Sequence, residues 1–296
     1  MPLSGDKRND ISNSWGFWRY ISFEHLASLL RSNELLFRKV SDFRDPYEGS
    51  IPKAYAERRD NSYQGDSDLP DSFPEVLRST NRLIRDSVYA NCWHRSDRES
   101  EAMWQNYGNR GVAIVSDFSS MCGALKSESR TVYMEEVHYL NYYDTYEQLS
   151  ILEQSELERA LTDTAKNIFG PVIMKRKSFK HEDEFRLLFP DIDLLTEEEY
   201  NKVDNNIVTD QNKWKQPLFV HLDGENGALD LRETPKINIA KIDADLDVLI
   251  NEIRINPKAD QWFKNTVEEL VDSLGPEQLT SDRVYSSATD LNEISF

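Results

Sequence analysis

The order of apolar and polar residues along the chain predicts short strands that alternate with amphipathic helices. Blocks rich in β-branched and aromatic residues, which favour strands, lie at residues 15–22, 35–37, 88–93, 111–115, 130–137, 137–142, 182–189 and 246–255. Stretches with apolar residues at helical spacing lie at residues 23–33, 74–85, 99–107, 146–168 and 259–274. We therefore expect an α+β fold with a mixed, mainly antiparallel central sheet flanked by helices.

Two of these helices carry the clearest signals. Ser22 can cap the first one, and Asn33 is a plausible stop for it. Three leucines of this helix share one face: Leu26, Leu29 and Leu30. In the last helix, five residues are expected to face the core: Trp262, Phe263, Val267, Leu270 and Val271.

Polar stretches divide an otherwise continuous pattern. Residues 58–75 and 191–215 are predicted to be loop-rich insertions, and residues 276–296 a C-terminal tail. With a core over about residues 15–275, the whole chain, 1–296, is predicted to be a single domain.

Composition limits the partners, the cysteine chemistry and the cellular location that we expect for this protein. Of 296 residues, 53 are acidic and 35 basic, and the net charge of −18 disfavours non-specific binding to DNA or RNA. The one dense basic run, residues 175–180, is expected to be a solvated strand edge. Two cysteines are too few for a disulfide framework or a zinc cluster. There is no apolar leader and no membrane-spanning stretch, which predicts a cytoplasmic protein.

Three sequence motifs hold residues with potential chemistry, each beside a structural alternative. Arg19 lies among aromatic residues at the first strand, where it could grip a phosphate or stack on Trp18 or Tyr20. Asp45 before Pro46 indicates a tight turn, with Glu48 free to pair with an arginine.

The third of these motifs contains Cys92 and His94, which share a strand face, followed by Trp104 and Tyr107 on a helix. A buried structural cysteine is the favoured interpretation of Cys92, although a Cys/His pair is geometrically allowed. Core packing is the default for the two aromatic residues, while a flat cofactor ring could also stack on them.

A fourth motif is the strongest functional candidate. Glu182, Glu184 and Arg186 alternate along a predicted strand, so their side chains should lie on one face. Two carboxylates this close raise each other's pKa unless a cation neutralises them. The motif is therefore either a site of chemistry or a ladder of ion pairs within the sheet.

Six segments in order resemble the bacterial family catalogued as domain of unknown function 2971. The matching segments, spread over about residues 17–275, are 19–22, 43–48, 103–107, 111–114, 182–186 and 251–253. Three positions depart from the family pattern: Arg44 stands in place of Asn, His94 in place of Ser, and Asn256 with Pro257 in place of Gly-Pro. The resemblance implies a shared fold and carries no reaction with it.

A more distant similarity is to the ADP-ribosyltransferase plan, which places a basic residue on the first strand and a Glu-x-Glu late in the chain. It implies NAD as the substrate, with Glu184 stabilising the oxocarbenium-like transition state and Glu182 acting on the acceptor. Arg19 would hold a phosphate, and Trp104 or Tyr107 would stack on a ring of NAD. Other residues of the implied NAD site are Tyr20, Ser22 and Arg186.

The role that this similarity implies is a bacterial toxin or an anti-phage effector. The acceptor would be a protein or a nucleic acid, and no metal is expected. The chain lacks the Ser-Thr-Ser motif and the central Tyr that mark the two main branches of that superfamily.

Two other functions compete with this one. A metal-dependent hydrolase or nuclease would need Asp45, Glu48, Glu182 and Glu184 to converge on an ion. A non-catalytic interaction or sensor module would instead show Glu182, Glu184 and Arg186 paired with one another. The transferase hypothesis itself requires Arg19 and Glu184 to face each other across one cleft.

Overall fold

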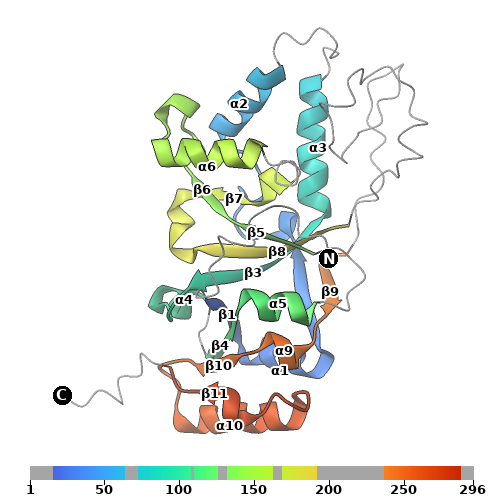
Figure 1. The fold of residues 1–296 in the computed structure, drawn as a ribbon, viewed down its shortest axis with the longest axis vertical. Coiled ribbons are helices and arrows are strands. Elements are labelled where there is room, and N and C mark those ends of the chain that lie inside the picture. The colour runs from blue at the N-terminus through green and yellow to red at the C-terminus, as the bar shows by residue number, and fades with distance from the viewer. Residues whose placement is uncertain are drawn as a thin grey trace, which may run out of the picture.

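The computed structural model describes residues 16–63, 73–107, 110–125, 132–162, 169–191 and 237–287. A nine-stranded sheet runs through this part of the chain in the order β11-β10-β4-β1-β3-β2-β9, with β8 paired to β3 and β5 paired to β8 (Figure 1). Its strands are β1 (Gly16–Ser22), β2 (Glu34–Lys39), β3 (Val88–Ser96), β4 (Gly111–Ser116), β5 (Tyr133–Glu136), β8 (Glu184–Pro190), β9 (Ile239–Asp243), β10 (Glu252–Ile255) and β11 (Val284–Tyr285). All its pairs are antiparallel except β10 with β11.

Two further strands, β6 (His138–Leu140) and β7 (Met174–Arg176), form a separate parallel pair. The α-helices are α1 (Phe23–Ser32), α2 (Lys53–Tyr63), α3 (Phe73–Ser87), α4 (Glu101–Asn106), α5 (Phe118–Ala124), α6 (Ile151–Thr162), α9 (Leu246–Leu249) and α10 (Gln261–Leu274). The 3-10 turns are η2 (Val40–Asp42), η3 (Tyr146–Gln148), η4 (Gly170–Val172), η5 (Lys177–Glu182) and η6 (Ser281–Arg283). This is the α+β class that the sequence predicts.

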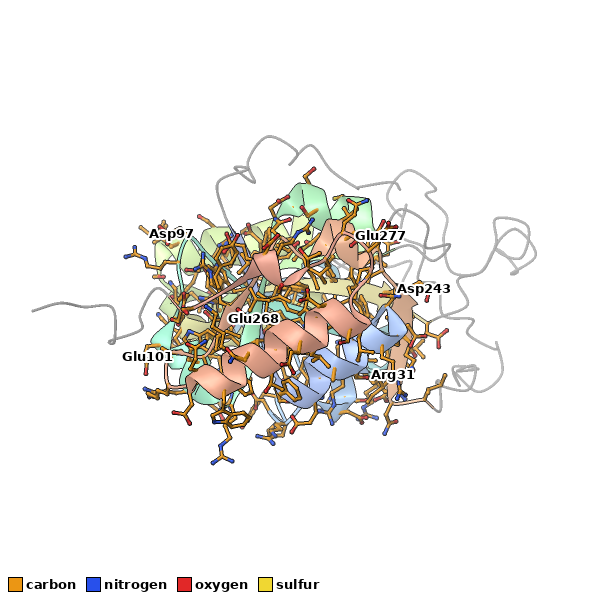
Figure 2. The ribbon with its side chains drawn as sticks, turned by 90° about the horizontal axis from the view of Figure 1, so that it is seen from below. Arg31, Asp97, Glu101, Asp243, Glu268 and Glu277 are labelled. Carbon is orange, nitrogen blue, oxygen red and sulfur yellow. The ribbon has the colours of Figure 1, made fainter. Side chains whose placement is uncertain are left out.

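The two faces of the sheet carry different cores. One face, which we call the main-core face, buries Phe17, Trp93 and Phe185 in the largest apolar cluster. Helices α1, α5, α9 and α10 supply the other side of that cluster, and α10 lies beside α1 (Figures 1 and 2). The other face, which we call the polar face, holds a smaller aromatic cluster with Trp18 and Trp104.

Helix α1 forms as the sequence predicts. The Ser22 side chain accepts from the backbone N–H of His25 at 3.4 Å, and Asn33 ends the helix in the left-handed conformation with φ 53°. The three leucines of the predicted apolar face are buried: Leu26, Leu29 and Leu30.

Several predicted elements are wrong. Residues 58–63 belong to α2, and residues 73–75 open α3, so the first insertion is shorter than expected. Residues 246–249 form a helical turn ahead of the strand, and the predicted tail contributes η6 and β11 to the fold. Of the helix predicted over residues 146–168, residues 151–162 are confirmed as α6, residues 146–148 form a 3-10 turn instead, and residues 163–168 lie outside the described part.

Some predicted segments are not covered by the structure. Residues 64–72, most of 191–215 and residues 288–296 lie outside the described part.

The predicted apolar face of the last helix is confirmed in part. Trp262 is 65% exposed rather than buried, whereas Phe263, Val267 and Val271 face the core as predicted. Among the described helices, none combines the length and apolar character that a membrane span requires.

Candidate functional site

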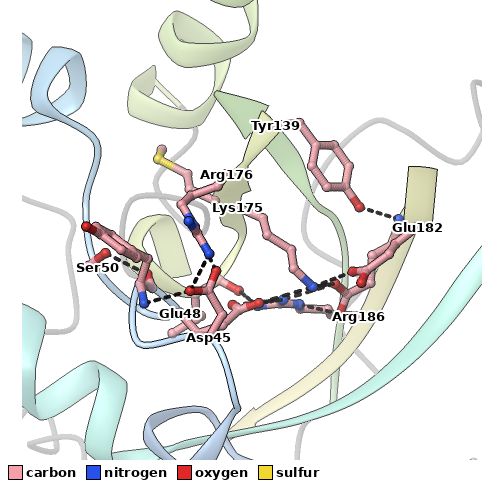
Figure 3. Close-up of polar contacts among 12 residues, drawn as sticks. Asp45, Glu48, Ser50, Tyr139, Lys175, Arg176, Glu182 and Arg186 are labelled. Atoms are coloured by element: carbon pink, nitrogen blue, oxygen red, sulfur yellow. Dashed lines mark hydrogen bonds and ion pairs between the residues drawn. The ribbon is translucent and has the colours of Figure 1, made fainter. Parts of the chain in front are cut away.

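Five charged side chains from distant segments meet on the polar face of the sheet. They are Glu48, Lys175, Glu182, Glu184 and Arg186, and each is at most 8% exposed. Figure 3 shows Glu48, Lys175, Glu182 and Arg186 directed toward one another, with Arg176 and Asp45 beside them. We call these five residues the charged cluster. It contains three carboxylates and two cations, so with all groups ionised it has one net negative charge.

The backbone between the two glutamates is not the continuous strand that the sequence predicts. Glu182 ends the turn η5, and Asp183 then takes a left-handed conformation with φ 33°. Glu184 begins β8, where it shares a face with Arg186 as predicted. Glu182 therefore reaches the cluster because of the turn, and its place does not follow from strand alternation.

Lys175 links all three carboxylates of the cluster. Its ammonium lies 3.0 Å from Glu184 and 3.2 Å from Glu48, and it also donates to Glu182. Burial alone would lower the pKa of Lys175, but the charges of Glu184 and Glu48 outweigh that effect and raise it. The lysine is thus held in its charged form.

Arg186 is fully buried and joins two carboxylates. Its Nε donates to Glu184 at 2.8 Å, its Nη2 donates to both oxygens of Glu48 at 3.0 and 3.1 Å, and its Nη1 donates to the carbonyl of Val172. Burial opposes the charged form, yet the two carboxylates raise the pKa of Arg186 above its ordinary value. In the same way, Arg186 and Lys175 outweigh burial and lower the pKa of Glu184.

The cluster approaches solvent at Glu182. The hydroxyl of Tyr107 donates to Glu182 at 2.6 Å, and Tyr107 is 49% exposed. Burial and the carboxylate of Glu182 together raise the pKa of Tyr107, so the phenol stays protonated. On the inner side, the backbone N–H of Glu184 donates to the hydroxyl of Tyr139 at 2.8 Å.

Cys92 and His94 lie beside the cluster on β3, opposite Arg186 and Glu184 respectively. Burial and the nearby Glu184 raise the pKa of Cys92 well above its ordinary value, which keeps the thiol protonated and poorly nucleophilic. His94 Nδ1 lies 2.6 Å from the carbonyl of Glu182, so Nδ1 carries a proton. The structural interpretation of Cys92 is therefore favoured over a reactive Cys/His pair.

Arg19 lies on the main-core face, opposite to the charged cluster. Trp18 is paired with His94, and His94 is paired with Glu184, so these three side chains share the polar face. Arg19 is the next residue after Trp18 on β1, so its side chain points to the opposite face. The sheet stands between Arg19 and Glu184, so the two cannot line one cleft. The geometry that the transferase hypothesis requires of this pair is absent.

The position of Arg19 has a topological cause. On one edge of β3, β1 pairs with residues 94–96 and β2 pairs with residues 89–90, which leaves residues 91–93 facing a split in the sheet. Arg19 Nη1 enters this split and donates to the Asn91 side chain at 2.6 Å and to the Cys92 carbonyl at 2.9 Å. Asn91 in turn donates to the carbonyl of Leu36 on β2 at 2.9 Å.

Three other residues of the expected NAD site have local partners. The Ser22 side chain caps α1, and the Tyr20 hydroxyl accepts from the backbone N–H of Ser100 at 2.9 Å. Trp104 is 2% exposed, packs edge-on against Tyr20 and donates to Glu99 at 3.0 Å. Of the two predicted stacking residues, only Tyr107 presents its ring to solvent.

The metal hypothesis meets a different obstacle. Asp45 receives two hydrogen bonds from Arg176, at 2.9 and 3.0 Å, instead of joining Glu184. Between Glu48, Glu182 and Glu184 stands the ammonium of Lys175. Within the described ranges, no three His, Cys, Asp or Glu side chains are grouped as a metal site.

The sequence interpretation missed the role of Lys175. The basic run was expected to be a solvated edge, and Lys177 and Lys180 are indeed exposed, but Lys175 is only 8% exposed. A signal was present, because Lys175 directly follows the apolar residues 171–174 and so continues a buried segment.

Comparison with known proteins gives one finding. Residues 103–187 match the model of a family described as "Protein of unknown function (DUF2971)". The matched span includes Tyr107, Lys175, Glu182, Glu184 and Arg186, and it supports the family resemblance found in the sequence. No curated protein and no solved structure matches the chain.

Proposed function

We propose that this protein binds a phosphate-bearing ligand, NAD or a related nucleotide, through Arg19. The observation that carries the proposal is a partly enclosed cation without a counter-charge. No carboxylate pairs with Arg19 among the described residues, and its two hydrogen bonds go to the neutral groups of Asn91 and Cys92. Burial lowers the pKa of Arg19, whereas carboxylates raise that of Arg186.

The hydrogen bonds of Arg19 leave two of its N–H donor groups available to bind an oxyanion. Only Nη1 is engaged, so Nε and Nη2 have no hydrogen-bond partner within the described part of the chain. These two N–H groups form the side of the guanidinium that grips a phosphate or carboxylate through two parallel bonds. Two residues of β3 hold the guanidinium in place. Asn91 accepts its hydrogen bond, and the ring centre of Trp93 lies 5.9 Å from the guanidinium carbon.

The proposal is tested by calorimetric titration of the full chain with NAD, ADP-ribose, AMP and inorganic phosphate. We expect saturable binding of at least one of them. Arg19→Met should weaken that binding by about 10- to 100-fold, as loss of a charge-assisted contact of about 1.5–3 kcal/mol requires. Arg19→Lys, which keeps the charge without the paired donors, should fall between the wild type and Arg19→Met.

Arg31→Met is the matched control, because Arg31 is an exposed arginine at the end of α1 (Figure 2). It should bind as the wild type does. Failure of all four ligands to bind, or equal binding by wild type and Arg19→Met, would refute the assignment. Circular dichroism and the unfolding midpoint of each variant separate lost binding from lost structure.

A second candidate is NAD cleavage of the ADP-ribosyltransferase type on the polar face, in a toxin or an anti-phage effector. It is favoured by the contact of Glu182 with the half-exposed Tyr107, and by the net negative charge of the cluster. A positively charged oxocarbenium would be stabilised by such a charge. Against it stands the full pairing of Glu184 with Arg186 and Lys175.

Release of nicotinamide from NAD tests this second candidate. An enzyme of this type should release it and should lose turnover in Glu182→Gln, and circular dichroism should show that the variant, although less stable, is still folded at the assay temperature. Wild-type protein that leaves NAD intact, alone and with protein or nucleic-acid acceptors, would exclude the reaction. Neither outcome depends on whether Arg19 binds a phosphate, so the two candidates are judged separately.

A further inference from the structure

Asn91 lies at the centre of the hydrogen bonds around Arg19. Its side chain is buried on the main-core face of β3, at the split in the sheet. The Oδ1 of Asn91 accepts from Arg19 Nη1 at 2.6 Å and from Trp93 Nε1 at 2.7 Å. Its Nδ2 donates to the carbonyl of Leu36 at 2.9 Å. One buried amide therefore links β1 and β2 across the split.

These partners fix the orientation of the Asn91 amide. The side-chain N–H groups of Arg19 and Trp93 can only donate, and the carbonyl oxygen of Leu36 can only accept. In a flipped amide, the NH2 group would face the two donors and the oxygen would face the carbonyl. Buried polar groups without partners are costly, so the amide keeps one orientation.

The fixed amide also sets the direction of the Arg19 guanidinium. Asn91 Oδ1 and the Cys92 carbonyl both accept from Nη1. Because a guanidinium is planar and rigid, holding Nη1 by two bonds also sets the directions of Nε and Nη2. The two N–H groups that the proposed phosphate would contact are thus oriented before the ligand binds.

The neutral charge of Asn91 matters as much as its position. An aspartate is of nearly the same size and could accept from Arg19 at the same place, but its charge would form an internal ion pair. Arg186 shows the effect of such pairing, because Glu184 and Glu48 accept from its Nε and Nη2. On Arg19, the same two groups have no hydrogen-bond partner among the described residues.

We propose that Asn91 is the positioning residue that makes the Arg19 site specific for an anionic ligand, an inference that rests on the proposed function. Its oxygen holds Nη1 in place. Because the amide is neutral, the phosphate of the ligand supplies the charge that compensates the guanidinium. Residue 91 thereby determines whether Arg19 pairs with a ligand or with its own chain.

Asn91→Asp tests the proposal by calorimetric titration with NAD, ADP-ribose, AMP and inorganic phosphate. Any of these that the wild type binds should bind about 10- to 100-fold more weakly, as for Arg19→Met, because the guanidinium already has an anion beside it. Adding Arg19→Met to Asn91→Asp should then weaken binding little further.

Asn265→Asp is the matched control. It adds the same charge at an exposed residue of α10 and keeps an acceptor for the side chain of Gln261. This variant should bind as the wild type does.

Unfolding midpoints without ligand separate a new ion pair from a damaged fold. A carboxylate at residue 91 cannot donate to the Leu36 carbonyl, so Asn91→Asp loses that bond with or without Arg19. Arg19→Met should lower the midpoint by at least about 3 °C more in the Asn91→Asp background than in the wild type. The reason is that only in that background does it leave a buried carboxylate without a cation.

Asn91→Ser keeps residue 91 neutral but shortens the side chain that holds Nη1. It should weaken binding by about 3- to 10-fold, the effect of one hydrogen bond, and the remaining binding should still depend on Arg19. This variant tests the positioning role even if Asn91→Asp does not fold.

Three results would each overturn the proposal. They are unchanged binding by Asn91→Asp, unchanged binding by Asn91→Ser, and loss of binding by Asn91→Asp without the difference in midpoints. Binding that is lost in Arg19→Met but kept in Asn91→Asp would refute this inference alone. Wild-type protein that binds none of the four ligands would refute the proposed function, and this inference with it.

Discussion

Removal of the Arg186 guanidinium should be the most damaging single change in the charged cluster. Arg186→Met keeps the length of the side chain but leaves two buried carboxylates, Glu48 and Glu184, that are 2% and 7% exposed, with only Lys175 as a neighbouring cation of the cluster. The net charge of the cluster then changes from −1 to −2 among side chains that are each at most 8% exposed. Glu184→Gln changes the net charge in the opposite direction, to zero, and should cost less.

The contacts set the magnitude of this effect. Arg186 makes two hydrogen bonds to Glu48, two to Glu184 and one to a carbonyl, all without solvent. Breaking one buried ion pair by removing a partner costs about 3–5 kcal/mol, and Arg186 serves two. We therefore expect Arg186→Met to lower the free energy of unfolding by about 5 kcal/mol, and Glu184→Gln to lower it by about 1–3 kcal/mol.

Urea unfolding at neutral pH, followed by both fluorescence and circular dichroism, measures the difference. Arg254→Met is the matched control, because Arg254 pairs with Glu252 at the surface, where the two side chains are 24% and 36% exposed. Such a pair contributes less than about 1 kcal/mol. Suppose that Arg186→Met lowers the free energy of unfolding no more than Arg254→Met does, or less than Glu184→Gln does. Either result would contradict the conclusion that the two cations of the cluster are needed to compensate its three buried carboxylates.

Three further predictions concern Gly111, Glu184 and Tyr107. Gly111→Ala should destabilise the sheet by at least about 2 kcal/mol in urea unfolding, because its Cβ would lie 1.9 Å from the carbonyl oxygen of Ile21. The pKa of Glu184 lies below its ordinary value of 4.5, so its contribution is complete above that pH and declines as pH falls. The stability difference between wild type and Glu184→Gln should thus shrink from about pH 7 to about pH 3, and an unchanged difference would contradict the lowered pKa. Tyr107→Phe removes the hydrogen bond to Glu182 and should cost about 1 kcal/mol, so a variant as stable as the wild type would show that this bond contributes little.

What the sequence predicts correctly here depends on short-range patterns. The Ser22 cap, the apolar face of α1 and the shared face of Glu184 and Arg186 all follow from the spacing of residues within one element. The α+β class follows from the order of those elements. None of these features needs knowledge of which strand lies beside which.

The partners in the candidate site could not be predicted in that way. Arg186 binds Glu48, which lies 138 residues earlier in the sequence, in the loop after β2, and the pairing of β3 with both β2 and β8 brings these segments into one region. The left-handed Asp183 breaks the alternation that placed Glu182 on the strand. Trp262 is 65% exposed, whereas the next residue, Phe263, about 100° further around α10, packs its ring against Phe23 of α1.

Two arginines of the sheet, the fully buried Arg186 and the partly buried Arg19, differ in how their charge is compensated. Arg186 is compensated from within by Glu48 and Glu184, its pKa is raised, and a ligand would have to displace a carboxylate to reach it. Arg19 has only the neutral Asn91 and a carbonyl as partners, and burial lowers its pKa. Desolvating a guanidinium without an anion is costly, and the split between β1 and β2 maintains that arrangement. A bound anion would offset the desolvation of Arg19, whereas Arg186 already has two carboxylates beside it. We therefore propose that Arg19 binds a ligand and that Arg186 stabilises the fold.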